Sequence, residues 1–220
     1  MCLLFVFNEI FIIFKTNFPV GMNIDSDLFK INHRRIKLKR GRKLIAEPLL
    51  SDYVFRRSVI LLVEYTSSGS MGLMLNKPSG IDLRQIIPSV RSMKESIPVF
   101  IGGPVGNNRL FYIHKLGHII PDAVKLSDGL FINGNFDSII AYIKSGNPIN
   151  ENIRFFLGYS GWEGGQLDVE IEEGVWVVSP YKEVDLDACI AGELYWNNAV
   201  LEMGPEYKVW LSFPKVPWLN

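Results

Sequence analysis

Residues 158–166, which read GYSGWEGGQ, combine the residue types of this sequence that are best suited to bind a ligand. Their four glycines allow the backbone to adopt positive φ or to approach another group closely. Trp162 adds a large amphipathic surface, and the backbone N–H groups of such a loop can cradle a ligand. The alternative is a tight turn between strands with a packed tryptophan. We treat Gly158, Gly161, Trp162 and Gln166 as part of a candidate ligand or partner surface.

Three well-known loop chemistries are absent from this segment. It contains neither the GxxxxGK[ST] pattern of a phosphate-binding loop nor the GxGxxG pattern of a dinucleotide-binding loop. Ser160 is not in a nucleophile elbow, because that turn needs glycine where Trp162 stands. The segment therefore predicts a surface whose chemistry its own residues do not specify.

Two further polar clusters frame a predicted hairpin. Arg57 and Ser58 precede the apolar run of residues 59–66, and Asn76 follows the run that returns from the turn at residues 67–70. The clusters would meet at one end of the sheet, where they could bind an anion. Turn chemistry and surface ion pairs are the alternative. Gly102 and Gly103 form another turn with Pro104.

The histidines and carboxylates allow weaker hypotheses. His114 and His118 have helical chelate spacing, but the intervening KLG indicates a turn, so we expect no metal site and no cofactor. Residues 167–171 alternate like a strand, which would place Gln166, Asp168 and Glu170 on one face. Such carboxylates could do acid–base work or hold a cation; a solvated strand face is the alternative.

The elements that would position these residues are mostly short strands. Since strands outnumber helices and few strand–helix–strand units occur, the pattern predicts a mixed, largely antiparallel α+β domain. Expected strands cover residues 43–47, 58–66, 71–75, 99–101, 109–114, 130–132, 153–157, 167–171, 175–178 and 209–213. Expected helices follow Asp82 up to Pro88, and cover residues 136–144 and 192–203.

Composition narrows the class of protein. The chain has 220 residues, 48% of them hydrophobic, which is enough for one well-buried core. Its formal net charge is zero, which disfavours a globally basic nucleic-acid binder. Two cysteines cannot form a disulfide framework, and together with the absence of a spanning segment this predicts a cytoplasmic protein.

The N-terminal part differs from the rest. Residues 3–14 are apolar but interrupted by Asn8 and Glu9, and we interpret residues 1–21 as a mis-assigned extension upstream of Met22. A weak membrane anchor or an atypical signal is the alternative. Residues 22–42 form a basic lead-in arm, and the domain covers residues 43–220. The basic cluster within residues 34–43 could contact phosphate backbone or anionic lipid, or could simply be a solvated segment.

Several blocks, taken in order, resemble the YqgE/AlgH family of bacterial proteins. The blocks are AEPLLSDYVFRRSV (46–59), GLMLNKP (72–78), FIGGPV (100–105), RLFYIH (109–114) and GYSGWEGGQLDVEI (158–171), with Trp176 downstream. The resemblance covers essentially residues 41–215, and its last block is highly specific. It implies an α+β fold with a bifurcated sheet and flanking helices, and a cytosolic protein without an assigned molecular activity.

Some members of that family are labelled transcriptional regulators, yet these residues contain no recognisable DNA-reading motif. The sequence also departs from the family pattern. Many members have histidine where Tyr65 stands, alanine at Ser160 and glutamate at Asp168. A catalytic or metal role at position 65 therefore does not transfer, and Ser160 is a poor nucleophile candidate.

We therefore expect a non-catalytic regulatory or binding protein, with a protein partner or a small anion as the ligand. The alternative is an enzyme or a nucleotide-binding protein that uses the glycine-rich loops. Either reading uses the same candidate surface, which comprises Arg57, Ser58, Asn76, Gly102, Gly103, His114, Gly158, Gly161, Trp162 and Gln166.

Overall fold

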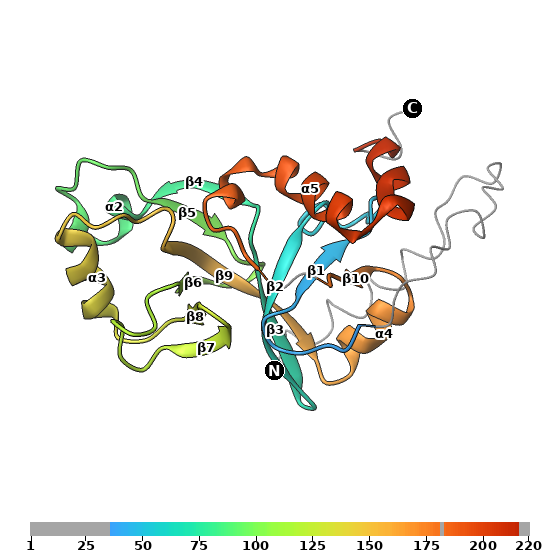
Figure 1. Cartoon of the computed structure of the whole chain (residues 1–220), viewed down its shortest axis with the longest axis horizontal. Coiled ribbons are helices and arrows are strands. Elements are labelled where there is room, and N and C mark those ends of the chain that lie inside the picture. Colours follow the sequence, from blue (N-terminus) through green and yellow to red (C-terminus); the bar gives the residue numbers. More distant parts are fainter. Residues whose placement is uncertain (1–35, 181–182, 216–220) are drawn as a thin grey trace, which may run out of the picture. The chain divides into compact units, whose positions relative to one another are not determined.

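The computed structural model describes residues 36–180 and 183–215 of the chain. The strands are β1 (Lys43–Ala46), β2 (Val59–Thr66), β3 (Gly69–Met74), β4 (Pro78–Asp82), β5 (Pro98–Ile101), β6 (Val105–His114), β7 (Val124–Ser127), β8 (Leu130–Ile132), β9 (Ile153–Glu163) and β10 (Trp176–Val178). The helices are α2 (Leu83–Ile86), α3 (Phe136–Lys144), α4 (Gln166–Glu172) and α5 (Glu193–Met203), with 3₁₀ segments η2 (Pro88–Val90), η3 (Ala188–Ala191) and η4 (Pro205–Ser212). Figure 1 shows their arrangement.

Strand β9 is the central strand, and the sheet divides into two branches along it. Its first half pairs in parallel with β5, from Val99 opposite Phe155 to Ile101 opposite Leu157. Its second half pairs antiparallel with β3 instead, with Gly72 opposite Ser160. The opposite edge of β9 pairs antiparallel with β6, with a register shift in the β6 segment. This change of partner confirms the expected α+β class with a mixed, largely antiparallel, bifurcated sheet.

The main path through the sheet is β10-β1-β2-β3-β9-β6-β8-β7, and β4 is attached through β5. The predicted hairpin is confirmed, because β2 and β3 pair antiparallel across the turn that precedes Gly69. Asp82 caps α2 as expected: its carboxylate accepts a hydrogen bond from the Arg84 N–H, while the Gln85 side chain accepts one from the Asp82 N–H.

Two clusters of buried apolar side chains lie on the two branches of the sheet. One gathers α3 residues such as Ile139 and Ile143 around Phe155 of β9. The other places Leu167 of α4 and the two indoles Trp162 and Trp176 against β1, β2 and β3. Helix α5 packs on β1 and β2 (Figure 1).

The expected strand at residues 167–171 was wrong: this segment lies in helix α4. A left-handed Gly165, at φ 79°, reverses the chain after β9, and the helix starts directly after it. The alternation in sequence was misleading because Glu170, which looked like a solvent-facing residue, is buried and pairs with two indoles. On a helix, Gln166 and Glu170 are four residues apart and share a face, whereas Asp168 points elsewhere and accepts a hydrogen bond from Tyr65.

The expected strand at residues 209–213 was also wrong, since this segment lies within and just after η4. Pro205 is tolerated at the start of this helical segment, where no N–H donor is needed. Tyr207 and Trp210, three residues apart, are both buried and contact each other edge to face.

Conversely, strand β4 was missed because it begins with a proline, a residue that normally argues against a strand interior.

The predicted boundaries at the N-terminus stay predictions. Residues 1–21, and residues 22–35 of the lead-in arm, lie outside the described part of the chain. Of the cations of the basic cluster that the structure describes, Lys37, Lys39 and Arg40 are exposed, whereas Arg42 donates to the Pro180 carbonyl at 2.7 Å and buried Lys43 lies 3.5 Å from Glu202. Arg42 and Lys43 therefore contact the folded domain and are not part of a free basic arm.

Glu47, directly after β1, predicts a pH dependence of stability. Burial raises the pKa of its carboxyl group to about 7 from 4.5. Below pH 4.5 the carboxyl is protonated in both the folded and the unfolded state. As the pH rises from 4.5 to 7, the unfolded chain releases this proton while the folded chain keeps it. The free energy of unfolding therefore falls with rising pH, by at most about 3 kcal/mol.

We therefore expect Glu47→Gln to raise the melting temperature at pH 8 and to leave it nearly unchanged at pH 4. Thermal denaturation of both proteins across this range measures the difference. The exposed Glu64 of β2 provides the control, and Glu64→Gln should shift the melting temperature by a similar small amount at both pH values. A Glu47→Gln effect that is equal at pH 4 and pH 8 would contradict this assignment.

Candidate functional site

The structure brings Arg57, Ser58 and Asn76 together, as the sequence predicted for this end of the hairpin. The Asn76 amide donates to the Arg57 carbonyl at 2.9 Å and to the Gly192 carbonyl at 3.0 Å. Its oxygen accepts a hydrogen bond from the Val59 N–H at 2.9 Å. Asn76 is thus a buried connector between the hairpin and the start of α5.

The positive charge of Arg57 is already paired with groups of the protein itself. Its guanidinium donates to the Glu193 carboxylate and to the Phe213 carbonyl, and lies 5.1 Å from the Trp196 ring centre. Burial raises the pKa of Glu193, but hydrogen bonds from Lys215 and Arg57 hold it below its usual value. The Ser58 side chain is fully buried beside this cluster. Because Arg57 already has a carboxylate partner, this cluster offers no open anion site.

The two glycine-rich segments lie directly against each other where the sheet divides. A Cβ atom on Gly102 would lie 2.2 Å from the Gly158 carbonyl oxygen, and one on Gly103 would lie 2.1 Å from the backbone of Tyr159. The Ser160 hydroxyl is fully buried and donates to the Gly102 carbonyl at 3.1 Å. The glycines allow two backbones to touch, and the space that a ligand would need between them is filled.

Trp162 and Gln166 belong to a buried hydrogen-bonded cluster around Glu170. One oxygen of that carboxylate accepts hydrogen bonds from the indole N–H groups of Trp162 and Trp176, at 2.8 and 2.7 Å. Its other oxygen accepts one from the Gln166 amide at 2.8 Å. Gly161 lies in the strand itself, opposite Met71 of β3. This end of the GYSGWEGGQ segment is strand and helix start, where the sequence suggested a loop.

His114 is far from that cluster. It pairs with Ile153 at the beginning of β9, whereas Gln166 follows the end of β9, a separation of about 30 Å along a strand. Its ring is fully buried, bonded through Nε2 to the Asn133 carbonyl and through Nδ1 to the Leu116 N–H. Burial lowers its pKa. The ten candidate residues therefore do not converge in one pocket.

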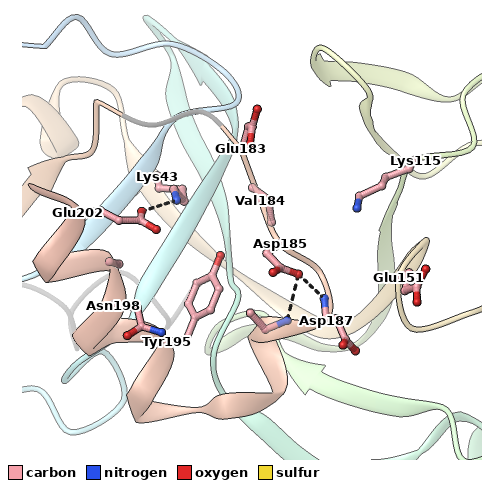
Figure 2. A pocket seen from close by; sticks show the side chains of 12 residues that line it. Lys43, Lys115, Glu151, Glu183, Val184, Asp185, Asp187, Tyr195, Asn198 and Glu202 are labelled. Carbon is pink, nitrogen blue, oxygen red and sulfur yellow. Dashed lines mark hydrogen bonds and ion pairs between the residues drawn. The ribbon is translucent and has the colours of Figure 1, made fainter.

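A different part of the molecule is hollowed, and Figure 2 shows it from close by. This acidic cleft has a volume of about 610 Å³. Its lining comes from β1, from the adjoining ends of β6 and β9, from the extended segment before η3, and from α5. The lining residues are Lys43, Lys115, Glu151, Glu183, Val184, Asp185, Asp187, Ala188, Tyr195, Asn198, Ala199 and Glu202.

Residues 183–187, EVDLD, form one wall of the cleft because their side chains alternate. Val184 and Leu186 are buried, whereas the three acidic residues between and beside them are exposed. Arg154, itself buried, donates to the Leu186 carbonyl and stacks 5.1 Å from the Phe100 ring centre. This anchoring holds the acidic wall against the sheet.

The charge of the cleft is unbalanced. Among the residues that the structure describes, five carboxylates and two lysines line it. The ammonium group of Lys43 lies 3.5 Å from Glu202, and Asp185 uses one oxygen to accept from the N–H groups of Asp187 and Ala188. Figure 2 shows the Tyr195 side chain extending between these walls, and burial raises the pKa of its hydroxyl, which therefore stays protonated at neutral pH. The arrangement suits a positively charged ligand with hydrogen-bond donors.

None of the acidic-cleft residues was part of the candidate surface proposed from the sequence, and Lys43 entered only as the end of the basic cluster. The available signal was the acid–apolar alternation of residues 183–187, which resembles any solvated extended segment. Lys115 and Glu151 come from distant parts of the chain, and only the pairing of β6 with β9 brings them near each other. Among the described residues, no three histidine, cysteine or carboxylate side chains are placed to share a metal ion.

Comparison with known proteins gives consistent results. Residues 43–208 match the model of the family described as AlgH-like. A UPF0301 protein of Bacteroides fragilis is 47% identical over 200 residues, which are 90% of this chain and 100% of the relative. A UPF0301 protein of Bacteroides thetaiotaomicron is 45% identical over 199 residues, again with 90% and 100% coverage.

Two solved structures are similar in fold. The solution structure of the AlgH protein of Pseudomonas aeruginosa has a TM-score of 0.58 and 26% identity, and the match covers 82% of this chain and 98% of that one. A crystal structure of a Corynebacterium diphtheriae protein has a TM-score of 0.67 and 24% identity, with 84% and 97% coverage. Within the described residues, no helix combines the length and apolar character needed to cross a membrane.

Proposed function

This chain belongs to the AlgH-like family, and we propose that it is a non-catalytic binding protein that takes a positively charged ligand in the acidic cleft. The observation that carries the proposal is the excess of carboxylates over lysines among the described residues that line a concave space of about 610 Å³. Since the formal net charge of the chain is zero, this excess is a local feature of the cleft. Clefts lined by one sign of charge raise the local concentration of oppositely charged ligands.

The positions of three reactive side chains support a non-catalytic role. Ser160, Cys189 and His114 are each fully buried. Burial also raises the pKa of the Cys189 thiol to about 11, which keeps it protonated and poorly nucleophilic. A substrate outside the fold cannot reach these groups without a rearrangement of the core.

A regulatory role in the cytoplasm remains part of the proposal. The protein would regulate by binding a ligand or a partner, and not by recognising a DNA sequence directly. The alternative of a small anion held by the glycine segments has less support, because Gly102, Gly103 and Gly158 contact one another. An acidic cleft also disfavours phosphate groups on electrostatic grounds.

Titration calorimetry with spermine, a flexible tetra-amine, tests the proposal. We expect binding at low ionic strength that weakens as salt is added, because added ions screen the attraction. The double variant Glu151→Gln, Asp187→Asn removes two exposed carboxylates of the cleft and should weaken spermine binding about tenfold, since each exposed pair contributes roughly 0.5–1 kcal/mol.

A matched double variant, Glu95→Gln and Glu172→Gln, removes two exposed carboxylates outside the cleft and should leave spermine affinity nearly unchanged. Equal losses in the two double variants, or no spermine binding at all, would overturn the proposal. Thermal denaturation with ATP or inorganic phosphate provides the anionic comparison. If either anion raises the melting temperature and spermine does not, the anion-binding alternative is favoured.

A further inference from the structure

Helix α5 and the preceding η3 expose large apolar side chains beside the acidic cleft. Ile190, Leu194 and Leu201 are 50%, 63% and 45% exposed. The opposite side of α5 is fully used by the core, where Trp196 and Val200 have no exposed surface. The outer side of this helix therefore carries leucines where a solvated helix normally carries polar residues.

Helical spacing connects these leucines to the cleft. Leu194, Asn198, Leu201 and Glu202 occupy positions i, i+4, i+7 and i+8, which lie along one face of an α-helix. Asn198 and Glu202 line the cleft, and Figure 2 shows both on the helix wall that borders it. The apolar row and the carboxylates are thus adjacent parts of one surface.

We propose that this surface, defined as Leu194 and Leu201 together with the acidic cleft, binds a basic amphipathic helix of a partner protein. The inference rests on the proposed function and names its ligand: the cationic groups that enter the cleft are lysine or arginine side chains. The partner's apolar side chains would cover the two leucines, while its cations would meet Glu151 and Asp187. Surplus carboxylates beside exposed leucines are complementary to that pattern of charge and hydrophobicity.

The same charges disfavour two other occupants. A second copy of this chain, related by two-fold symmetry, would present its own acidic cleft near the first, and like charges would repel. An anionic membrane surface would be repelled by the carboxylates in the same way. A basic partner segment satisfies both the apolar and the charged part of the surface.

The test compares two synthetic peptides of 18 residues and identical leucine–lysine composition. In one, the leucines follow helical spacing and form a single face; in the other, they are scrambled around the helix. By titration calorimetry with the full chain, we expect the first peptide to bind at least tenfold more tightly than the second. Spermine is measured alongside and reports on the cleft alone.

Variants at the leucines separate this inference from the proposed function. Leu194→Gln with Leu201→Gln should weaken binding of the amphipathic peptide about tenfold and leave spermine binding unchanged. The matched control, Ile119→Gln with Val169→Gln, changes apolar side chains that are 47% and 52% exposed at other positions, and should alter neither affinity. Circular dichroism confirms that each variant remains folded.

Equal affinity for the two peptides, or an unchanged peptide affinity in the leucine variant, overturns the inference. If spermine still binds in that case, the proposed function stands. Loss of spermine binding together with equal peptide affinities overturns both. Spermine binding in the original chain, combined with a peptide-specific loss in the leucine variant, supports both.

Discussion

Replacement of Glu170 by alanine should lower the free energy of unfolding by about 3–5 kcal/mol, because it leaves two buried indole N–H donors without acceptors. Each unsatisfied buried donor costs about 1–3 kcal/mol. The Gln166 amide would lose its bond to the same carboxylate. Glu170 is 8% exposed, so water can reach these donors only if α4 moves away from the sheet.

Urea denaturation of Glu170→Ala measures this change directly. The neighbouring Glu172 lies on the same helix but is exposed, so Glu172→Ala should change the unfolding free energy by less than about 0.5 kcal/mol. Trp162→Phe keeps most of the buried ring, removes one donor, and should give a smaller loss than Glu170→Ala. Similar stability of the Glu170 and Glu172 variants would show that the carboxylate does not hold the two indoles.

Replacement of Gly158 by alanine is the second large effect, with an expected loss of about 3–5 kcal/mol from backbone strain and overpacking together. Gly158 has φ of 67°, and its added Cβ would lie 2.6 Å from the Gly103 carbonyl oxygen and 2.8 Å from that of Val105. Both neighbours are backbone atoms, one in the turn between β5 and β6 and one at the start of β6, so neither can rotate away as a side chain could. The variant must separate the strands at the point where the sheet divides.

Gly174 provides a matched control for the strain alone. It has φ of 81°, yet nothing lies within 4 Å of an added Cβ. Gly174→Ala should therefore cost only the left-handed backbone strain of about 1–2 kcal/mol. Both variants are compared by urea denaturation, and by near-ultraviolet circular dichroism, which reports on the packing of the aromatic side chains, Trp162 among them. Equal losses at positions 158 and 174 would mean that the contact with Gly103 is unimportant.

These two predictions give the GYSGWEGGQ segment a different role from the one that its composition suggests. Its glycines bring two backbones into contact, and its tryptophan and glutamine complete a buried cluster with Glu170. The spermine and peptide measurements concern another surface, built by residues from β1, the 183–188 segment and α5. Loss of stability and loss of binding are therefore expected from different substitutions.

Local patterns in the sequence were sufficient for several elements. The apolar spacing of residues 136–144, with Gly146 and Pro148 beyond them, predicted α3 at its observed bounds. The turn residues 67–70 predicted the β2–β3 hairpin, and Asp82 predicted the cap of α2. These signals succeed because the interactions that stabilise each element lie within a few residues of one another.

The same patterns failed where distant contacts decide the structure. Alternation over residues 167–171 fits a strand, but burial of Glu170 beneath two indoles and the reversal at Gly165 make the segment a helix. Strand β9 continues through the glycines to Glu163 because β3 and β6 provide hydrogen-bonding partners there. No local window contains those partners.

The sequence by itself determined the α+β class and the family, and it marked the glycine-rich segments, because these follow from local spacing and from contiguous motifs. Only the tertiary structure decided what those segments do. Arg57 is neutralised by Glu193, 136 residues away, and His114 and Gln166 are held at opposite ends of one strand. The acidic cleft likewise exists only because strand pairing and the Arg154 anchor bring Lys115, Glu151 and the 183–188 wall together with α5.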